Sequence, residues 1–573
     1  MTSQPFVFKI GGEAGFGIGS AGLTFAKIAS RSGYHVFDYL EYPSIIRGGH
    51  NVLEVCVSEE KIRAPYAHTD FLLALNQETL DRHMHELSTD AIVLFDSEFK
   101  MNASKLPSSV TALDIPAFRL AKENGSTILM RDTITLGATI ALLEGSLKIF
   151  NELIAEEFAR KGEEVVKKNQ LLAHIGFEYI QKHFSHAHKP ILRPKKKTKP
   201  QLVINGNEAV ALGAIAGGMQ FAAIYPMTPT SNILHVLAAH QAEFDFIYKQ
   251  PEDEISAINM AIGAAFAGAR SMVATAGGGF CLMAEGYGLA GMTETPVVMI
   301  EGMRGSPATG LPTWTEQGDL RFVLHAHQGD FPRIVLAPGD VDEAFHMTMQ
   351  AFNLAEIYQT PVVVMIDKHL CESHESTKPF DYHSFTINRG KFKHAHIDNY
   401  ERYAPSHDGI SLRVPAGTGT HVIANSDEHS PTGYSSEESS DRIEQMNKRM
   451  QKLETCATKD MPEPTLYGPA QAPLTIVSWG STKGVILEAL KTHPEINFLH
   501  LTWLSPFPTE AVKKILSKAH MILNIELNYS AQLGGLITEK TGIFLPHHLL
   551  KYDGRPIFPE EISAKIEELT KNT

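Results

Sequence analysis

The sequence predicts an α/β protein made of several domains. Strand-like and helix-like segments alternate over residues 1–185 and again over 201–374, as expected for βαβ units. A shorter pattern of the same kind returns at 466–573. A chain of 573 residues with 43% hydrophobic content is too long for a single core, so three or four domains are expected.

The first domain is predicted at 1–185. Its helix is expected at Ala21–Arg31, and its strands are expected at Phe6–Ile10, His35–Leu40, Val52–Val57, Phe71–Ala74 and Ala91–Phe95. Residues 186–200 then combine six basic side chains with three prolines. Because such a run lies between two periodic regions, we expect a linker there.

The second domain is predicted at 201–374 and ends with the apolar strand Pro361–Ile366. Residues 375–465 lose the alternation, so we expect a connecting arm that wraps a neighbouring surface and contains one charged helix. The third domain, 466–573, is expected to hold a helix near Gly484–Thr492 and the strands Leu474–Trp479, Ile496–Leu501 and Met521–Leu527.

The second domain contains the motif Tyr225-Pro226-Met227-Thr228-Pro229. It follows the apolar run that ends at Ile224, so a strand should lead directly into a rigid turn. Two prolines restrict the backbone on either side of Thr228. We therefore expect the Thr228 hydroxyl to point outward from the turn.

A glutamate and a small-residue helix follow. Glu254 is the last residue of an acidic cluster and the first residue of a predicted helix. This helix is rich in Ala and Gly, including Ala257 and Gly263. A carboxylate in the first turn is favourable beside the helix N-terminus. The small side chains behind it would let another backbone or a flat ligand approach closely.

An arginine loop follows the next predicted strand, Pro296–Ile300. The segment from Glu301 to Thr313 is rich in Gly, Pro, Ser and Thr, so it is predicted to be a loop throughout. Its one arginine, Arg304, follows the carboxyl end of the strand, where parallel sheets bind ligands. A planar guanidinium suits a carboxylate, which it can bind with two hydrogen bonds.

These three motifs together resemble the pyrimidine-binding domain of thiamine-diphosphate enzymes, and in particular the 2-oxoacid:ferredoxin oxidoreductases. Residues 1–185 are similar to the Rossmann-like gamma component of that family, fused ahead of an alpha component. The last domain, with Gln532-Leu533-Gly534-Gly535, resembles a transketolase C-terminal-like domain. The resemblance covers nearly the whole chain, and the arm is its least defined part.

The resemblance implies roles for five residues. Glu254 would be the catalytic group that hydrogen bonds the aminopyrimidine of thiamine diphosphate, while Tyr225 and Pro226 would line the cofactor site. Arg304 and Thr228 would bind the carboxylate of the 2-oxoacid. The implied reaction converts a 2-oxoacid, CoA and oxidised ferredoxin to acyl-CoA, CO₂ and reduced ferredoxin, or the reverse. We expect 2-oxoglutarate as substrate, with pyruvate or a broad range of 2-oxoacids as the alternative.

Part of such an enzyme is missing from this sequence. The Gly-Asp-Gly and distant Asn that hold a Mg²⁺-bound pyrophosphate are absent, and the four cysteines form no cluster motif. No metal site is predicted in this chain. The resemblance therefore implies a beta subunit that carries the pyrophosphate domain, Mg²⁺ and a four-iron four-sulfur cluster, in an α₂β₂ assembly that transfers electrons to ferredoxin.

The N-terminal glycines raise an alternative of another class. Gly17-Ile18-Gly19-Ser20-Ala21-Gly22 matches the dinucleotide fingerprint, and Asp38 ends the next predicted strand, which would suit an NAD- or FAD-dependent oxidoreductase. However, Gly17 lies seven residues beyond Ile10, where the strand is predicted to end. Gly12, Gly15 and Gly17 are instead candidates for binding an anion such as a CoA phosphate at a helix N-terminus.

Composition excludes several other functions. A net charge of −14 argues against nucleic-acid binding. The cysteines are far apart, which argues against a disulfide scaffold and fits a reducing compartment. The N-terminus has no signal-like segment, and no apolar run approaches the roughly 20 residues of a membrane span. A cytoplasmic protein without nucleic-acid or membrane partners is expected.

Overall fold

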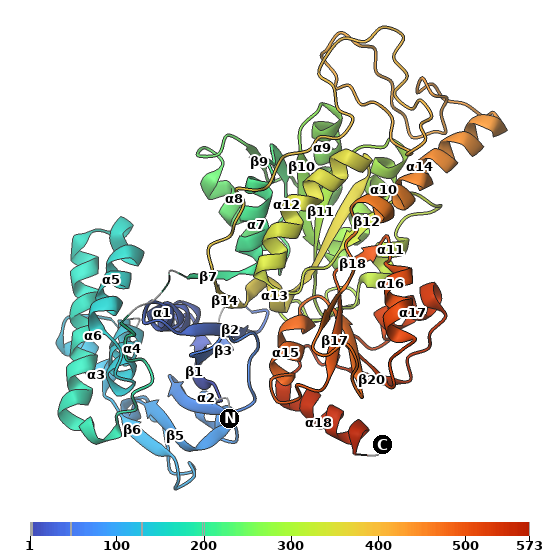
Figure 1. The fold of residues 1–573 in the computed structure, drawn as a ribbon. Helices are drawn as coiled ribbons and strands as arrows, with labels where there is room; N and C mark the ends of the chain where they lie inside the picture. Colours follow the sequence, from blue (N-terminus) through green and yellow to red (C-terminus); the bar gives the residue numbers. More distant parts are fainter. Residues whose placement is uncertain (1–3, 46–47, 128–129, 197–198, 200, 572–573) are drawn as a thin grey trace.

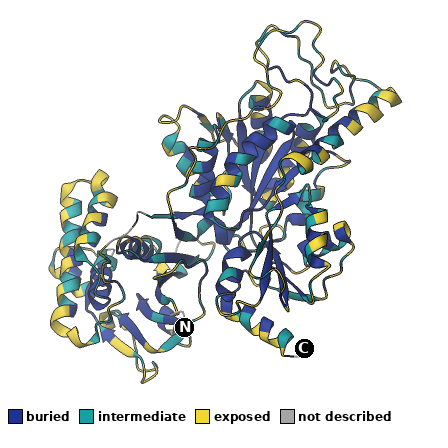
Figure 2. Cartoon of the chain, in the orientation of Figure 1, coloured by how far each residue is buried: buried dark blue, intermediate teal, exposed yellow. Residues whose placement is uncertain are grey.

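The computed structural model describes residues 1–573 except 1–3, 46–47, 128–129, 197–198, 200 and 572–573. Three β-sheets flanked by helices form three lobes (Figure 1). The N-terminal lobe lies beside the other two, and long loops project from the far end of the central lobe. The inner strands of the central sheet are buried, whereas its edge strand at Ile247–Lys249 and the outer faces of the peripheral helices are largely exposed (Figure 2).

The first sheet has the strand order β6-β5-β4-β1-β3-β2-β14-β7. β1 is parallel to β4, whereas β3 lies between β1 and β2 and runs antiparallel to both. The strands are β1 (Phe6–Ala14), β2 (His35–Glu41), β3 (Gly48–Ser58), β4 (Thr69–Ala74), β5 (Leu87–Phe95), β6 (Thr111–Asp114), β7 (Leu202–Asn205) and β14 (His374–Thr377).

Helices of the first lobe pack closely on one another. A Cβ on Gly137 would meet the Ala173 carbonyl and one on Gly176 would meet the Ile134 carbonyl, so two helices cross there in direct backbone contact. The helices are α1 (Ile18–Arg31), α2 (Gln77–His83), α3 (Ala117–Glu123), α4 (Arg131–Leu142), α5 (Leu147–Phe158) and α6 (Glu163–His183).

The second sheet has the order β18-β12-β13-β11-β10-β8-β9, with every strand parallel except the edge strand β18. Its strands are β8 (Phe221–Ala223), β9 (Ile247–Lys249), β10 (Ser271–Ala276), β11 (Val297–Met303), β12 (Ile334–Leu336), β13 (Pro361–Asp367) and β18 (Trp503–Ser505). Its helices are α7 (Gly206–Ala216), α8 (Ser231–His240), α9 (Glu254–Phe266), α10 (Gly277–Met292), α11 (Leu320–His325), α12 (Val341–Tyr358) and α13 (Lys368–Glu372).

The third sheet has the order β15-β17-β16-β19-β20 and is parallel apart from β15. It matches the predicted third α/β unit closely. Its elements are β15 (Thr465–Tyr467), β16 (Thr475–Trp479), α15 (Thr482–Ala489), β17 (Asn497–Leu501), α16 (Thr509–Leu516), β19 (Ile522–Glu526), α17 (Gln532–Thr541), β20 (His547–Leu550) and α18 (Pro559–Thr570).

Two strands at the limits of the expected second domain belong to the sheet of the first. β14 pairs with β7 over four residues and with β2 at Glu375 and Phe37. Asp38 on β2 is buried and accepts hydrogen bonds from the backbone N and ring Nδ1 of His374, at 2.6 and 2.9 Å. The first two lobes are therefore joined by a shared sheet as well as by the basic segment at 186–200.

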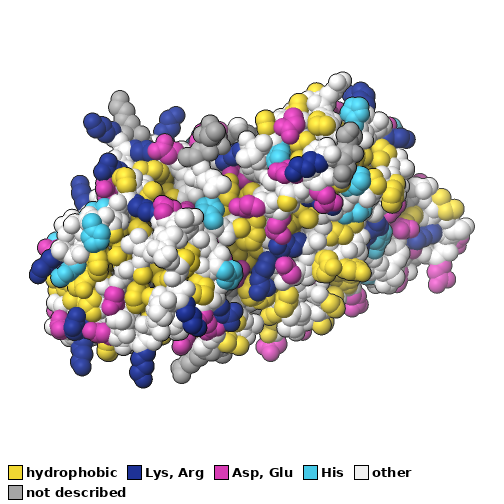
Figure 3. Space-filling view, turned by 90° about the horizontal axis from the view of Figure 1, so that it is seen from below, with side chains coloured by type: hydrophobic (Ala, Val, Ile, Leu, Met, Phe, Trp, Pro, Cys, Tyr) yellow, Lys and Arg dark blue, Asp and Glu magenta, His cyan; other side chains and the backbone are white. Residues whose placement is uncertain are grey.

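Two lysines of the basic segment contact the first lobe. The Lys189 ammonium donates to the Asp90 carboxylate at 2.9 Å, and the Lys195 ammonium lies 4.6 Å from the ring centre of Tyr34. On the face of the molecule seen from below, basic and acidic side chains are interspersed (Figure 3).

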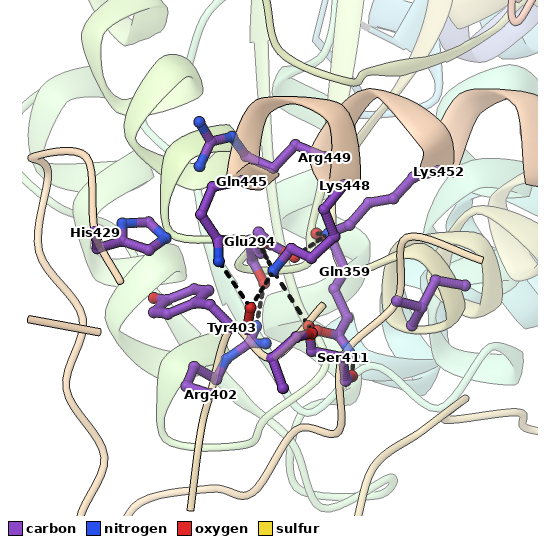
Figure 4. A network of polar contacts seen from close by, with 12 residues as sticks. Glu294, Gln359, Arg402, Tyr403, Ser411, His429, Gln445, Lys448, Arg449 and Lys452 are labelled. Atoms are coloured by element: carbon purple, nitrogen blue, oxygen red, sulfur yellow. Dashed lines mark hydrogen bonds and ion pairs between the residues drawn. The ribbon is translucent and has the colours of Figure 1, made fainter. Parts of the chain in front are cut away.

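The arm predicted at 375–465 begins in β14, continues as the projecting loops and ends in α14 (Ser439–Lys459). A buried ion cluster fixes α14 to the central lobe (Figure 4). The Glu294 carboxylate, 0% exposed, lies 2.7 Å from the Lys448 ammonium and 2.6 Å from that of Lys452. Arg402 from the loops donates to the Glu294 carbonyl at 2.7 Å.

The cluster makes a testable contribution to stability. Burial alone would raise the pKa of Glu294, but Lys452, Lys448 and Arg402 lower it well below its ordinary value of 4.5. We expect Glu294→Gln to destabilise the chain by about 3–5 kcal/mol, because it leaves buried cations unpaired. The measurement is denaturant unfolding, with Glu438→Gln as an exposed control on the same arm.

The contribution of Glu294 to the stability of the folded chain should depend on pH. Since the folded-state pKa of Glu294 is depressed, its stabilisation is complete above 4.5 and decreases as the pH falls toward the folded-state pKa. The stability difference between wild type and Glu294→Gln should therefore shrink in acid. A difference that is constant from neutral to acid pH would show that the carboxylate charge is not what stabilises the arm.

Candidate functional site

The predicted motifs meet at the carboxyl edge of the second sheet. Tyr225 and Pro226 follow β8, and Arg304 follows β11, two strands away in the sheet order. The Arg304 guanidinium donates from Nη1 to the Thr228 carbonyl at 2.8 Å, so two residues 76 positions apart are in direct contact. Thr228 is half-buried, and its hydroxyl makes no hydrogen bond with any described residue.

Glu254 is the first residue of α9 and is buried, at 3% exposure. The preceding residue caps the helix, because the Asp253 carboxylate accepts from the Ser256 N–H at 2.7 Å. Asp253 is therefore the residue that caps the helix, and the Glu254 carboxylate is not required for capping. Among the described residues, nothing hydrogen bonds to its Oε1. A buried polar atom without a partner is costly and usually marks a ligand or a function.

Helix α10 begins with three glycines, and the last of them, Gly279, lets the Glu254 carboxylate approach the helix. A Cβ on Gly279 would lie 2.6 Å from Glu254 Oε1 and still closer to Thr275 Oγ1. A Cβ on Gly277 would overlap the Asp319 carboxyl, whereas Gly278 faces open space. Two carboxyls thus lie against the first turn of α10, where the helix dipole favours negative charge.

This arrangement predicts opposite effects for neighbouring substitutions. Gly279→Ala should destabilise the chain by about 1–3 kcal/mol, because the added methyl overlaps Thr275 and Glu254. Gly278→Ala should be neutral or stabilise by up to about 1 kcal/mol, as alanine generally does in a helix. Thermal unfolding of the isolated chain compares them; equal effects would contradict the close approach.

The arginine loop begins later than predicted. Glu301 to Met303 continue β11 and pair with Met365 to Asp367 on β13, so the prediction of a loop from Glu301 is wrong. From Arg304 the loop is held by the first and third lobes, since Thr313 Oγ1 donates to the Tyr42 carbonyl at 2.7 Å and Arg555 stacks 3.4 Å from the ring centre of Trp314. Burial lowers the pKa of Arg304, while nearby Asp319 acts to raise it.

Behind the site, α9 and α10 present an uncovered apolar face. Its large side chains are 37–49% exposed, and the Gly263 position between them is open. They are Ile255, Met260 and Phe266 on α9 and Leu282 on α10. Large exposed apolar residues grouped beside a candidate site are typical of an interaction surface.

The N-terminal glycines do not form a dinucleotide site. β1 extends to Ala14, so the prediction that the strand ends at Ile10 is wrong, and Gly12 is a paired strand residue opposite Asn51. Gly15 and Gly17 form the turn, with φ of 94° and 69°. Because β3 lies between β1 and β2, the strand that follows α1 is not the adjacent parallel neighbour of β1 that a dinucleotide-binding βαβ unit requires.

Other side chains already fill the positions that a nucleotide would need. Asp38, the candidate for a ribose contact, is buried and bonded to His374. The Asp132 carboxylate lies 2.5 Å from where a Cβ on Gly17 would stand, at the N-terminus of α1. Burial raises the pKa of Asp132 to about 6. A carboxylate of the chain itself thus occupies the place proposed for a bound anion.

Three further groups at the site were not identified from the sequence. Thr275 on β10 and Glu301 on β11 are neighbours in register, and Asp319 lies in contact with Glu301. Glu301 follows four apolar strand residues directly. A carboxylate in that position is a signal that could have identified it.

Over the described part of the chain, no group of three or more His, Cys, Asp or Glu is placed to hold a metal ion. Cys281 is exposed on α10, and Cys56, Cys371 and Cys456 are buried and unpaired. Among the described helices, none has the length and apolar character required to span a bilayer.

Comparison with known families defines the class of protein. Residues 212–450 match the family model described as pyruvate flavodoxin/ferredoxin oxidoreductase, thiamine diphosphate-binding. Residues 7–179 match the model described as pyruvate ferredoxin/flavodoxin oxidoreductase. The central lobe is thus a thiamine diphosphate-binding domain of an oxidoreductase, preceded by the domain that we compared with the gamma component.

Relatives extend the match to the whole chain. The 2-oxoacid:ferredoxin oxidoreductase subunit alpha of Sulfolobus sp. is 33% identical, over 98% of this chain and 96% of its own. The 2-oxoglutarate synthase subunit KorA of Archaeoglobus fulgidus is 34% identical and covers 64% of this chain and 98% of its own. The chain therefore belongs to the alpha subunits of the 2-oxoacid:ferredoxin oxidoreductases, which confirms the predicted family and fold class.

A solved structure agrees with this assignment. The 2-oxoglutarate:ferredoxin oxidoreductase of Magnetococcus marinus, solved with 2-oxoglutarate, coenzyme A and succinyl-CoA bound, is 30% identical. The match covers 99% of both chains, with a TM-score of 0.91. The predicted enzyme class is confirmed. The identity of the 2-oxoacid and the role of each site residue stay predictions.

Proposed function

We propose that this chain supplies the pyrimidine half of a thiamine diphosphate site and the carboxylate-binding residues of a 2-oxoacid:ferredoxin oxidoreductase that uses 2-oxoglutarate. The observation that carries the proposal is the buried, unpartnered Oε1 of Glu254 at the same sheet edge as the Arg304–Thr228 contact. The preference for 2-oxoglutarate is supported by the similarity to the Magnetococcus marinus enzyme, in which that substrate is bound.

The residues present fit one half of the cofactor. Glu254 would hydrogen bond the aminopyrimidine through the oxygen that has no described partner, and Tyr225 and Pro226 would line the adjacent wall. Thiamine diphosphate, when bound, would supply a nucleophilic carbon and an electron sink for decarboxylation of the 2-oxoacid. Arg304, which uses one hydrogen bond to hold the Thr228 carbonyl, would orient the substrate carboxylate with its remaining N–H groups.

The other half of the site would come from a partner. We propose a beta subunit that holds the pyrophosphate through Mg²⁺, carries a four-iron four-sulfur cluster and passes electrons to ferredoxin, in an α₂β₂ assembly. The uncovered face of α9 and α10 lies directly behind Glu254 and is the surface that this subunit would cover. CoA would be the acyl acceptor, although Asp132 argues against a phosphate site at Gly12, Gly15 and Gly17.

Expression with and without the partner tests this proposal. The chain alone should be colourless and inactive, and it should bind no thiamine diphosphate tightly. Co-expression with the smaller subunit should give bound cofactor, iron and 2-oxoacid-dependent reduction of ferredoxin. Full activity with stoichiometric iron in the isolated chain would overturn the divided site. A higher turnover with pyruvate than with 2-oxoglutarate would overturn the substrate assignment alone.

A further inference from the structure

A pair of carboxyl groups lies behind the proposed cofactor site without any role assigned so far. Glu301 on β11 is 0% exposed, and neither of its oxygens receives a hydrogen bond from an N–H or hydroxyl group of a described residue. Its carboxyl is in hydrogen-bonding contact with that of Asp319 instead. Two carboxyls in contact away from water cannot both be ionised cheaply, so such a pair retains a proton.

The groups that face this pair come from several elements. Glu301 faces Asp319 before α11, Asp367 at the end of β13 and Cys281 on α10, and Asp319 faces Arg304. Asp367 is already satisfied, since it caps α13 through the Leu370 N–H and accepts from Thr315. Burial, followed by Asp319 and Asp367, raises the pKa of Glu301 well above its ordinary value, which agrees with a retained proton.

Thr275 lies beside both this pair and Glu254, and its hydroxyl donates a long hydrogen bond of 3.4 Å to the Ala276 carbonyl. Thr275 and Glu301 are paired in register on adjacent parallel strands, so their side chains project from the same face of the sheet. The Thr275 hydroxyl and Glu254 Oε1 both lie within 2.6 Å of the position that a Cβ on Gly279 would occupy. A hydroxyl can donate and accept at once and can rotate between two partners.

Asp319 is the member of this series of groups that lies nearest the solvent. Asp319 is partly exposed, in contrast to Glu301 and Glu254, which are both buried. The order of the groups is therefore solvent, Asp319, Glu301, Thr275 and Glu254. The glycines at the start of α10 keep this line free of side chains at both Asp319 and Glu254.

We propose that Asp319, Glu301 and Thr275 form a proton relay that protonates and deprotonates Glu254 from the solvent. In the inward direction, Asp319 takes a proton from water, Glu301 passes its own proton to the Thr275 hydroxyl, and that hydroxyl gives up its proton to Glu254. The proton on Asp319 then moves to Glu301, which restores the pair, and no electrons are exchanged. The relay rests on the proposed function of Glu254, whereas the protonated pair does not.

The first experiment tests the pair in the isolated chain. Infrared spectroscopy should show a carboxylic-acid C=O band at mildly alkaline pH, above the raised pKa values of Asp132 and Glu375, which are about 6 and about 7. Glu301→Gln should remove the band, and Asp319→Asn should shift it, because the partner carboxyl is lost while Glu301 stays buried. Glu252→Gln, which changes an exposed carboxyl outside the pair, should leave it unchanged. A band unchanged in both pair variants overturns the proposal.

The second experiment tests the relay in the reconstituted complex. Thr275→Val removes the hydroxyl at nearly constant shape, and Thr275→Ser retains it. Exchange of the cofactor C2 proton with D₂O, followed by NMR after acid quench, should slow by about 10²-fold in Thr275→Val and recover in Thr275→Ser. Equal rates in the two variants overturn the relay. A wild-type complex that binds no thiamine diphosphate overturns the proposed function and the relay together, but the infrared result for the pair would still stand.

Discussion

Glu254→Gln should reduce 2-oxoacid-dependent ferredoxin reduction by about 10²–10⁴-fold in the complete enzyme, while leaving the chain folded. The amide has the same shape as the carboxylate but cannot carry the charge that the aminopyrimidine requires. Because no described group hydrogen bonds to Oε1, the substitution removes no such contact from the isolated chain at that atom. Its melting temperature should stay the same or rise, since a neutral amide costs less to bury than a carboxylate without a partner.

Glu252→Gln is the matched control for this prediction. Glu252 belongs to the same acidic cluster but is exposed, so its substitution should leave turnover unchanged. Steady-state turnover and cofactor affinity of both variants provide the comparison. Near-normal turnover for Glu254→Gln together with an inactive Glu252→Gln would show that the catalytic carboxylate has been assigned to the wrong residue.

Arg304→Ala should weaken the use of every 2-oxoacid by roughly 2–5 kcal/mol in transition-state binding, because a buried carboxylate would lose its charged partner. Arg304→Lys keeps the charge but not the planar fork, so it should recover only part of the loss. The measurement is kcat/KM for 2-oxoglutarate, pyruvate and a longer 2-oxoacid. A loss confined to 2-oxoglutarate would instead place Arg304 at the distal carboxylate of that substrate.

The contact between Arg304 and Thr228 requires a second control. Arg304 also anchors the loop by donating to the Thr228 carbonyl, so Arg304→Ala could act by releasing that loop. Thr228→Val removes only the hydroxyl and preserves the carbonyl. If Thr228→Val raises KM and Thr228→Ser does not, the hydroxyl itself contacts the substrate. If both behave as wild type, the prediction for Thr228 is wrong.

Local sequence signals were sufficient for much of the fold and for the central motifs. The apolar runs predicted β16, β17 and β19 to within two residues, since each is a short buried strand bounded by polar residues. Glu254 and Arg304 could be found because each begins or follows a regular element in a recognisable motif. Their meeting at one sheet edge follows from parallel topology.

The features that the sequence did not predict depend on pairing over long distances. β7 and β14 have four residues each and are separated by more than 160 positions, so no local periodicity identifies their shared sheet. Pairing with β3 keeps Gly11 and Gly12 in β1, although glycine in isolation suggests a turn. Glu301 was assigned to a loop because the segment from Glu301 to Thr313 is rich in Gly, Pro, Ser and Thr, whereas its pairing with β13 and its neighbour Asp319 are visible only in three dimensions.

The strand pairing of β14 with β2 has a consequence for how the first lobe is attached. A chain cut within 186–200 would still present β7 and β14 as a two-stranded ribbon to the open edge of β2, with His374 bonded to Asp38 and Ser376 Oγ accepting from the Val36 N–H at 2.9 Å. The covalent connection would then be replaced by β-augmentation between two molecules. The same interface can therefore serve a fused chain or two separate subunits without a change in its hydrogen bonding.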